Sequence, residues 1–525
     1  MKLVTIQEAA EWASDFLKKE ISSSNISYLI QYGKVDKHRD NGSTFVNLDD
    51  LRKYYRSYRG WREINWKERL GKDLNWALSF DHLREKDTTK HVHRLHPYKG
   101  KFIPQLVEYF IDEHTDKVKQ KVYFKKGDIL LDPFMGSGTA LVQANELGIH
   151  SIGIDISKFN CLIAKSKLQN YDISYLEKTS KKIILELNSY EKDNKISQFE
   201  EDLLNKLYVF NQKYFPSPGF RYKVNKGMIN EEKYAAEKER EFLPIYKELI
   251  RKYNVKLQQS KSLTFLDQWF IQNARNEIDF TLDFVREEKD STVRMLLAII
   301  LSRTVRSCRA TTHSDLATLK EPQFTTYYCH KHRKICKLLF SIKKMFNRYA
   351  YDTLVRIKEF ERLKTGVYWS IITADGRTVD ILKEVKKESA YFLKLLSTQK
   401  IRGIFSSPPY VGQIDYHEQH AYAYELFGLT RKDELEIGPL SKGQSYDAQR
   451  EYIQGVADVL KNCRKFLTPN FDVFLVANDK YNLYPAIAAK SNMIIVNQFK
   501  RPVLNRTERD RTPYSEIIFH FKESK

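Results

Sequence analysis

Residues 128–155, DILLDPFMGSGTALVQANELGIHSIGID, decide the fold of this chain. An apolar run ends at Asp132 and passes directly into a glycine-rich turn, after which a helical stretch and a second apolar run follow. A strand, a loop, a helix and a strand in this order form an α/β unit, and successive units of this kind build a parallel sheet. The sequence therefore predicts an α/β fold whose sheet begins here.

The turn between strand and helix stands where backbone N–H groups and the helix dipole can meet a ligand. A phosphate-binding P-loop needs a lysine after the second glycine, and none follows Gly138; a dinucleotide fingerprint needs a third glycine where Leu141 stands. Gly136 and Gly138 instead fit a tight turn on which a ligand lies against the backbone. Asp155, at the tip of the next strand, has the acidic position that holds ribose hydroxyls in nucleotide-type sites, although acids at strand tips also simply face solvent.

The β/α pattern resumes in the last third of the chain. Further strands are expected in VYWSIITADG (367–376), IRGIFSSPPY (401–410), DVFLVAND (472–479), MIIVNQF (493–499) and SEIIFHF (515–521). Because a loop rather than a helix joins the last two, we expect them to form an antiparallel pair at one edge. The prediction is a seven-stranded Rossmann-like sheet.

Residues 171–365 interrupt this pattern with long, charged, mostly helical segments, so we expect a large helical insertion between the second and third strands. The predicted domains are an N-terminal module (1–60), the first half of the sheet domain (61–170), the insertion (171–365) and the second half of the sheet domain (366–525).

The first fifty-odd residues read as helix, turn, helix, hairpin and helix, with the hairpin turn near Asn41 and Gly42. This order resembles the excisionase and MerR-like winged helix-turn-helix modules, in which the second helix enters the major groove of DNA. A small helical cap that packs only on its neighbour is the alternative. The resemblance implies DNA contacts by Ser24, Asn25 and Tyr28.

Composition narrows the class of protein. The 525 residues are 42% hydrophobic and 30% charged, which is typical of a soluble globular protein, and the net charge of +21 favours a polyanionic partner, most often nucleic acid. Five scattered cysteines argue against a disulfide framework. Without a signal-like N-terminus or an apolar run of membrane-spanning length, we expect a cytoplasmic protein with no membrane partner.

Two basic segments are candidates for DNA contact. Arg303, Arg306 and Arg309 are spaced three apart and would share one face of a helix, where they could meet phosphates or remain a solvated basic face. The loop 501–516 carries several arginines, of which Arg506 is our candidate for the DNA backbone.

CHKHRKIC (329–336) contains two cysteines and two histidines. Its spacing differs from that of a standard zinc finger, in which two ligand pairs stand well apart, and on a helix the ligands would spread around the axis. We expect a basic, DNA-facing helix here and predict no metal site.

DPFMGSGT and the downstream SSPPY resemble the amino-methyltransferases, which use S-adenosylmethionine to methylate an exocyclic amine of a nucleic-acid base. HPYKGKFIP (96–104) resembles the segment before the glycine loop in these enzymes, and the likeness covers about 90–170 and 366–525. It implies a methyltransferase sheet, S-adenosylmethionine as cofactor, and a target-recognition region in the insertion (171–365) between the two halves. The implied cofactor contacts are the loop residues Asp132, Pro133, Phe134, Gly136, Gly138 and Thr139, the ribose-binding Asp155, the adenine-binding Asp375, and the covering residues Lys101, Phe102 and Pro104.

The tetrapeptide Ser407–Tyr410 fits the demands of this chemistry. A base amine is a poor nucleophile because its lone pair is delocalised, so acceptors positioned on its protons favour attack. We expect the Ser407 hydroxyl and the Pro408 carbonyl to be those acceptors, Pro408 and Pro409 to stiffen the backbone, and Tyr410 to stack on a flipped base. A structural Pro-Pro stop with a packed tyrosine is the alternative.

Family members with serine at the first position lean to cytosine N4, and those with aspartate or asparagine to adenine N6. The sequence thus predicts a site-specific methyltransferase of duplex DNA, with cytosine N4 as the favoured target and a cognate restriction endonuclease as partner. Carbon-5 methylation is discounted, because it needs a cysteine nucleophile after a proline and none of the cysteines follows one. An adenine N6 enzyme, an RNA base methyltransferase and a non-catalytic DNA-binding regulator remain open.

Overall fold

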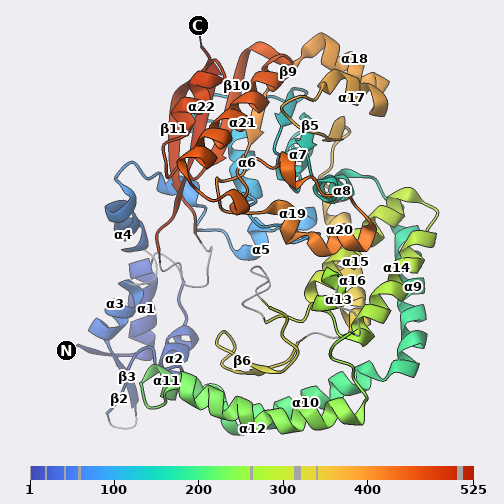
Figure 1. Ribbon diagram of the computed structural model, residues 1–525. Helices are drawn as coiled ribbons and strands as arrows, with labels where there is room; N and C mark the ends of the chain where they lie inside the picture. Colours follow the sequence, from blue (N-terminus) through green and yellow to red (C-terminus); the bar gives the residue numbers. More distant parts are fainter. Residues whose placement is uncertain are drawn as a thin grey trace.

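A seven-stranded sheet forms the centre of the computed structural model (Figure 1), which describes residues 2–17, 20–40, 43–56, 61–259, 264–312, 321–338, 341–504 and 512–524. Its strands are β4 (Ile129–Asp132), β5 (His150–Asp155), β8 (Trp369–Thr373), β9 (Ile401–Ser406), β10 (Leu467–Ala477), β11 (Met493–Pro502) and β12 (Ser515–Glu523). Strands β8, β5, β4, β9 and β10 run parallel, and β12 lies antiparallel between β10 and β11. The predicted α/β sheet with an antiparallel last pair is confirmed.

The strand order places a topological switch point at β4. In the sheet order β11-β12-β10-β9-β4-β5-β8, the chain leaves β4 for β5 on one side and returns to β9 on the other. Open α/β sheets bind ligands outside the carboxyl ends of their strands at such a point. All four residues of β4 are buried, as expected for a parallel strand covered on both faces.

Helices cover both faces of this sheet. They are α6 (Pro104–Ile111), α7 (Thr139–Glu146), α8 (Lys158–Leu168), α17 (Ile381–Glu388), α18 (Ala390–Gln399), α21 (Tyr446–Arg464) and α22 (Tyr484–Lys490), with the short α19 (Tyr416–Gln419), α20 (Ala421–Phe427), η3 (Asp433–Leu435) and η4 (Leu440–Lys442) after β9. The two faces are packed by separate clusters of buried hydrophobic side chains.

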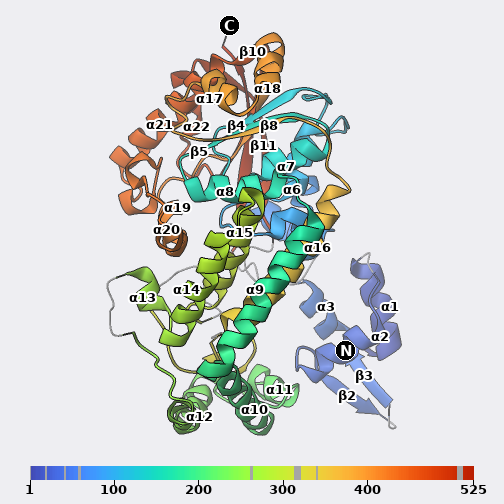
Figure 2. The same ribbon diagram turned by 90° about the vertical axis from the view of Figure 1, so that its right-hand side faces the viewer.

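A long helical arm lies between β5 and β8 in sequence. It consists of α9 (Ile173–Asn194), α10 (Ile196–Tyr214), α11 (Gly219–Asn225), α12 (Glu231–Lys252), α13 (Phe265–Trp269), α14 (Gln272–Glu287), α15 (Ser291–Ser307), the hairpin of β6 (Tyr327–Cys329) and β7 (Lys334–Cys336), and α16 (Ile342–Glu361). Figure 2 shows α9, α14, α15 and α16 running side by side from the sheet to α10, α11 and α12 at the far end. The insertion therefore extends well away from the sheet.

The N-terminal module contains the predicted elements in the predicted order. They are α1 (Ile6–Leu17), α2 (Ser23–Gln31), β2 (Lys37–Asp40), β3 (Ser43–Asn47) and α3 (Leu48–Arg56), and they are preceded by β1 (Leu3–Thr5). The backbone N–H of Thr5 donates to Glu8 Oε2 at 2.7 Å at the start of α1. Strand β1 was not expected; it pairs with β3, while the turn at Asn41–Gly42 lies outside the described residues. The winged helix-turn-helix assignment stays a prediction.

The N-terminal module contacts the tip of the helical arm. The Asn225 side chain donates to the Tyr32 carbonyl at 2.6 Å, Lys226 pairs with Asp36, and the Arg221 guanidinium lies over the Tyr32 ring. These contacts join α2 and its following loop to α11.

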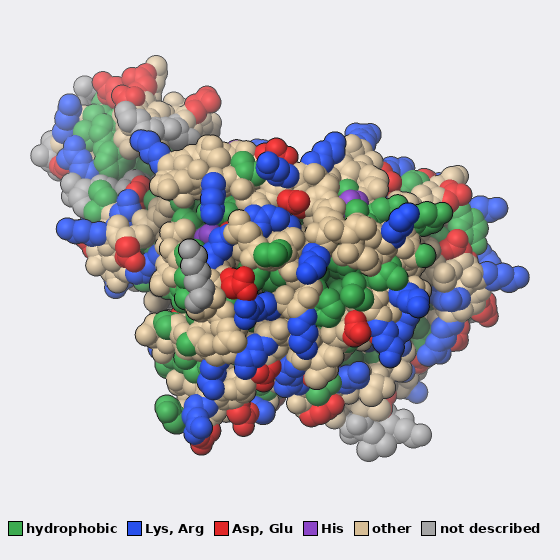
Figure 3. Space-filling model, turned by 90° about the horizontal axis from the view of Figure 1, so that it is seen from above, with side chains coloured by type: hydrophobic (Ala, Val, Ile, Leu, Met, Phe, Trp, Pro, Cys, Tyr) green, Lys and Arg blue, Asp and Glu red, His purple; other side chains and the backbone are tan. Residues whose placement is uncertain are grey.

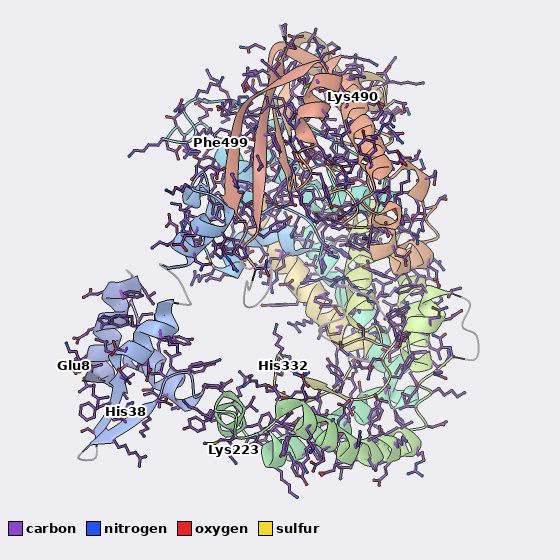
Figure 4. The ribbon with its side chains drawn as sticks, turned by 60° about the vertical axis from the view of Figure 1, so that its left-hand side comes forward. Glu8, His38, Lys223, His332, Lys490 and Phe499 are labelled. Atoms are coloured by element: carbon purple, nitrogen blue, oxygen red, sulfur yellow. The ribbon has the colours of Figure 1, made fainter. Side chains whose placement is uncertain are left out.

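The segment between the N-terminal module and the sheet domain packs against β11, the strand at one edge of the sheet. It comprises α4 (Trp61–Leu70), η1 (Trp76–Ser79), α5 (Glu85–Thr88) and η2 (His91–Arg94). The Asn75 N–H donates to the Lys500 carbonyl of β11 at 2.7 Å, and Asp73 lies 3.2 Å from the Lys500 ammonium. The N-terminal module, the arm and the sheet domain are thus arranged in a ring (Figures 1 and 4).

Basic side chains are spread over the face of the molecule that is seen from above. Figure 3 shows Lys and Arg side chains distributed across the face above the sheet, with Asp and Glu among them. Among the described helices, none is long and apolar enough to cross a membrane.

Candidate active site

A pocket lies at the carboxyl ends of β4, β5, β8 and β9, where the switch point predicts a ligand site. Its cavity volume is about 100 Å³. The predicted residues that line it are Lys101, Phe102, Pro133, Phe134, Gly136, Thr139, Asp155, Asp375, Ser407 and Pro409. The cofactor and catalytic candidates therefore share one cavity.

The glycine turn is held against the tip of β5. The Gly136 N–H donates to Asp155 Oδ2 at 2.8 Å, and the Ser157 N–H donates to Oδ1 at 2.8 Å. The Asn160 amide adds a third donor at 3.2 Å. Burial raises the pKa of Asp155 to about 6 in spite of these hydrogen bonds. Asp155 thus orders the turn and presents its remaining acceptor capacity to the pocket.

Asp132 lies behind the pocket instead of lining it. Its carboxylate is buried, and the Ser406 hydroxyl of β9 donates to it at 2.5 Å across the switch point. Burial raises the pKa of Asp132 to about 7, and the hydrogen bond from Ser406 opposes that rise. The first serine of SSPPY therefore fastens β9 to β4, and the second one, Ser407, faces the pocket.

The segment before β4 covers the glycine turn. A methyl group on Gly136 would come within 2.9 Å of the Tyr98 hydroxyl, so the close approach requires glycine, whose φ here is +51°. The Lys101 ammonium donates to the His93 carbonyl at 2.7 Å, and burial lowers its pKa to about 8. Pro104 takes no part in the pocket, because it forms the first turn of α6.

The tetrapeptide is anchored from the edge of the sheet. The Tyr410 hydroxyl donates to Glu516 Oε1 at 2.8 Å, and Arg501, the cross-strand partner of Glu516, lies 3.4 Å from its other oxygen. Pro408 is buried and Tyr410 is half-buried. Neither Pro408 nor Tyr410 is among the residues that line the pocket.

Three polar side chains on the pocket wall fit a polar ligand. Within the described part of the chain, the buried oxygens Ser137 Oγ, Thr139 Oγ1 and Asn160 Oδ1 have no hydrogen-bond partner. A buried polar atom without a partner is costly, and a ligand that hydrogen-bonds to it removes that cost. Asp375 is engaged by Arg377 at 2.9 Å; burial acts to raise its pKa, but the hydrogen bonds from Arg377 outweigh this and lower it.

Several lining residues were missed by reasoning from sequence. Tyr98 and Asn160 are among them, and Tyr98 belongs to the HPYKGKF segment that had already been singled out. Tyr416 and His417 were not missed: the sequence placed their patch after SSPPY beside this site, with structural packing as the alternative, and both line the pocket. The His417 N–H donates to Glu436 Oε1 at 2.8 Å. Glu436 follows a short helical turn in a loop, and no signal in the sequence pointed to it.

Arg303 and Arg306 of α15, and Arg309 just after this helix, do not share a free face. Arg303 is buried in an ion pair with Asp352 at 2.7 Å, and its guanidinium lies over the Tyr349 ring. Arg309 is also buried and packs over Tyr422, which leaves Arg306 half-buried as the most accessible of the three. Spacing alone predicted a common face, but α15 is covered on more than one side by its neighbours. Phosphate contact by Arg303 and Arg309 is therefore not supported.

The remaining DNA-binding candidates differ in their placement. Ser24, Asn25 and Tyr28 are exposed on α2, although Asn25 also caps the helix by accepting from the Ser22 N–H at 2.9 Å. Arg506 lies outside the described residues.

The segment 329–336 is not a helix, contrary to expectation. It is the hairpin of β6 and β7, and it brings Cys329, His332 and Cys336 together. The helical prediction was wrong because the basic residues were taken as the face of a helix, whereas tyrosine and cysteine at the strand ends pack inward.

An α/β sheet with a glycine turn and Ser407 at one cavity agrees with the methyltransferase fold that the sequence predicted, and comparison with known proteins identifies the class as DNA methyltransferases. A protein-family model described as DNA methylase matches residues 14–166. The type II methyltransferase M.MjaII of Methanocaldococcus jannaschii is 48% identical over 99% of this chain and 97% of its own length. Type II methyltransferases M.MvaI of Kocuria varians (39% identical) and M.BsoBI of Geobacillus stearothermophilus (37%) match shorter stretches, 20% and 18% of this chain and 21% and 17% of their own.

This chain belongs to the family of type II DNA methyltransferases. No solved structure matches it.

Proposed function

We propose that this protein is a site-specific DNA methyltransferase of a restriction–modification system, which methylates an exocyclic base amine in duplex DNA, with cytosine N4 as the favoured target. One observation carries the proposal: the glycine turn, Asp155 and Ser407 line the same pocket at the switch point of the sheet. A cofactor held by the glycine turn and Asp155 would present its reactive group beside Ser407.

The cofactor we assign to the pocket is S-adenosylmethionine. When bound, it supplies a methyl group on a positively charged sulfur. Asp155 would accept from a ribose hydroxyl, Asp375 from the adenine amino group, and the glycine turn would contact the methionine part. The unpartnered oxygens of Ser137, Thr139 and Asn160 favour a ligand with several polar groups.

The residues of the tetrapeptide would activate the base amine by position. The Ser407 hydroxyl and the Pro408 carbonyl would accept the two amine protons, which favours a pyramidal nitrogen with a free lone pair. The two prolines hold these acceptors still, and the β9 strand that carries them is fixed to β4 by Ser406 and Asp132. The Glu516 carboxylate holds the Tyr410 ring so that it can stack on a flipped base.

Serine at the first position supports cytosine N4, since the resemblance associates aspartate or asparagine there with adenine N6. A serine hydroxyl both donates and accepts, so it can also meet the ring nitrogen next to the amine. Membership of a DNA methylase family favours DNA over RNA as substrate. An adenine N6 product is the result that would replace the cytosine assignment.

DNA would lie in the region enclosed by the sheet domain, the arm and the N-terminal module. The exposed face of α2 with Ser24, Asn25 and Tyr28 is the part assigned to the major groove, and Arg306 and Arg506 are candidates for phosphate contact. A cognate restriction endonuclease would share the recognised sequence.

The experiment that tests the proposal is transfer of a labelled methyl group. The protein is incubated with methyl-labelled S-adenosylmethionine and either plasmid DNA or total RNA. We expect label in DNA, with Ser407→Ala reducing transfer about 100-fold, the scale of losing one positioned polar group, and leaving cofactor affinity unchanged. Ser397→Ala on the exposed side of α18 is the matched control. Label in RNA alone, or full activity in Ser407→Ala, would contradict the proposal, and transfer to neither substrate would indicate a regulator.

A further inference from the structure

The β6–β7 hairpin at the far end of the arm gathers three side chains that commonly bind metal ions. In the antiparallel register Cys329 stands opposite Lys334 and Cys336 opposite Tyr327, so the two cysteines lie diagonally across the strands. His332 sits in the connecting turn, where the Arg333 N–H donates to the Cys329 carbonyl at 2.6 Å. The two Sγ atoms and the His332 nitrogen all lie within 4.8 Å of one another.

The distances fit tetrahedral coordination. Zinc binds sulfur at about 2.3 Å and imidazole nitrogen at about 2.0–2.1 Å, so a tetrahedral site places sulfur and nitrogen roughly 3.6 Å apart. His332 Nδ1 is 3.3 Å from Cys329 Sγ and 3.6 Å from Cys336 Sγ. Both cysteines are buried, whereas His332 is partly exposed. The ligand atoms therefore already surround a point at which a small cation could sit.

We propose that Cys329, His332 and Cys336 bind one zinc ion, with water in the fourth position. Two thiolates and one imidazole are a donor set that selects zinc over hard cations such as Mg²⁺. The inference is independent of the methyl-transfer reaction, because it concerns the arm and no residue of the pocket.

The hairpin supports the element on which the N-terminal module is docked. The Arg221 guanidinium donates to the His332 carbonyl at 3.3 Å, and the Arg333 guanidinium donates to Asn225 Oδ1 at 2.9 Å. Asn225 in turn holds Tyr32 of the N-terminal module. Figure 4 labels His332 and, on the adjacent α11, Lys223. The ion would therefore fix the turn whose carbonyl and arginine hold α11 in place.

A second contact connects the hairpin to the body of the arm. The Asn211 side chain of α10 donates to the Ile335 carbonyl at 3.0 Å and accepts from its N–H at 2.9 Å. The Tyr328 hydroxyl donates to Glu231 of α12 at 2.9 Å. The middle of the hairpin is therefore held by α10 and α12, and the ion would join the two strand ends to the turn that contacts α11.

The test uses the full-length protein, expressed in zinc-supplemented medium and dialysed against metal-free buffer. Elemental analysis is expected to give about one zinc per chain. Replacement by Co²⁺ should produce the near-ultraviolet thiolate charge-transfer absorption. Cys329→Ser and Cys336→Ser are expected to lose both signals, whereas Cys463→Ala, which removes a buried thiol in α21, should keep them.

Wild-type protein without zinc under these conditions would overturn the proposal, as would equal zinc content in the two serine variants. A Cys329–Cys336 disulfide in the freshly purified protein, detected by mass spectrometry of its peptides, would also overturn it and indicate a redox pair instead. Should the serine variants fail to fold, titration of wild-type thiols with a mercurial decides: zinc release in proportion to thiol modification is expected, and thiols that react without any zinc release would refute the site.

Discussion

Replacement of Asp155 by asparagine tests how the pocket recognises its cofactor. The carboxylate accepts from the Gly136 N–H, the Ser157 N–H and the Asn160 amide. Two carboxylate oxygens offer about four acceptor positions, so three internal donors leave about one for a ligand hydroxyl. Asparagine has one oxygen, and its amide group would face at least one of the internal donors. The substitution therefore removes the acceptor offered to the ligand.

The expected loss follows from the strength of a hydrogen bond to a charged group. Such a bond contributes about 1.5–3 kcal/mol, which corresponds to roughly 10- to 150-fold in the dissociation constant. We expect Asp155→Asn to weaken S-adenosylmethionine binding within this range. Isothermal titration calorimetry measures it, with Asp128→Asn, a turn-capping carboxylate before β4, as the control for a general loss of charge.

The pH dependence provides an independent check. Because the pKa of Asp155 is raised to about 6, its carboxylate is protonated at lower pH and loses acceptor capacity. Cofactor affinity should rise with pH up to about 7 and then level off, and Asp155→Asn should lack this rise. The same raised pKa means that ionisation of Asp155 lowers the free energy of unfolding as pH increases from about 4 to 6. Wild-type affinity in Asp155→Asn, or an unchanged pH profile, would refute this role for Asp155.

Other substitutions test other parts of the account. Glu516→Gln should lower the turnover number about tenfold and leave cofactor affinity unchanged, because it removes the charged acceptor of the Tyr410 hydroxyl. A change in cofactor affinity alone would contradict the idea that Glu516 positions Tyr410. Gly138→Ala should lower the melting temperature more than Gly127→Ala, because both glycines have positive φ but only a methyl group at 138 would clash, at 2.8 Å from the Ala164 methyl. Equal losses in the two variants would show that the clash contributes nothing beyond backbone strain. Tyr28→Ala should weaken DNA binding in a gel-shift assay and spare cofactor affinity, and unaltered DNA binding would remove α2 from the interface.

The sheet and the pocket could be predicted because their signals are local. The apolar run of β4, the glycine turn and Asp155 follow one another within one α/β unit, and the chain order of such units determines which strand ends meet. Ser407 could be assigned to the same site because the strand before it, β9, runs parallel to β4 and ends at the same edge of the sheet. The antiparallel last pair followed from the loop that joins its strands in place of a helix.

The missed features depend on long-range packing. Arg303 is buried because α16 places Asp352 beside it, and sequence spacing carries no information about that neighbour. Glu436 reaches the pocket from an irregular loop. The hairpin at Cys329 was assigned as a helix because charge was weighed above the pairing of two three-residue strands, which are too short to show a strand period.

The central claim is that this pocket and its tetrapeptide methylate a base amine in DNA. The most direct test is to express the protein and its Ser407→Ala variant in cells without other methyltransferases, digest their DNA to nucleosides, and identify the methylated ones by mass spectrometry. The account predicts N4-methylcytosine with the wild-type protein and its loss in the variant. N6-methyladenine would overturn the choice of base, and DNA with no methylated nucleoside would contradict the claim itself.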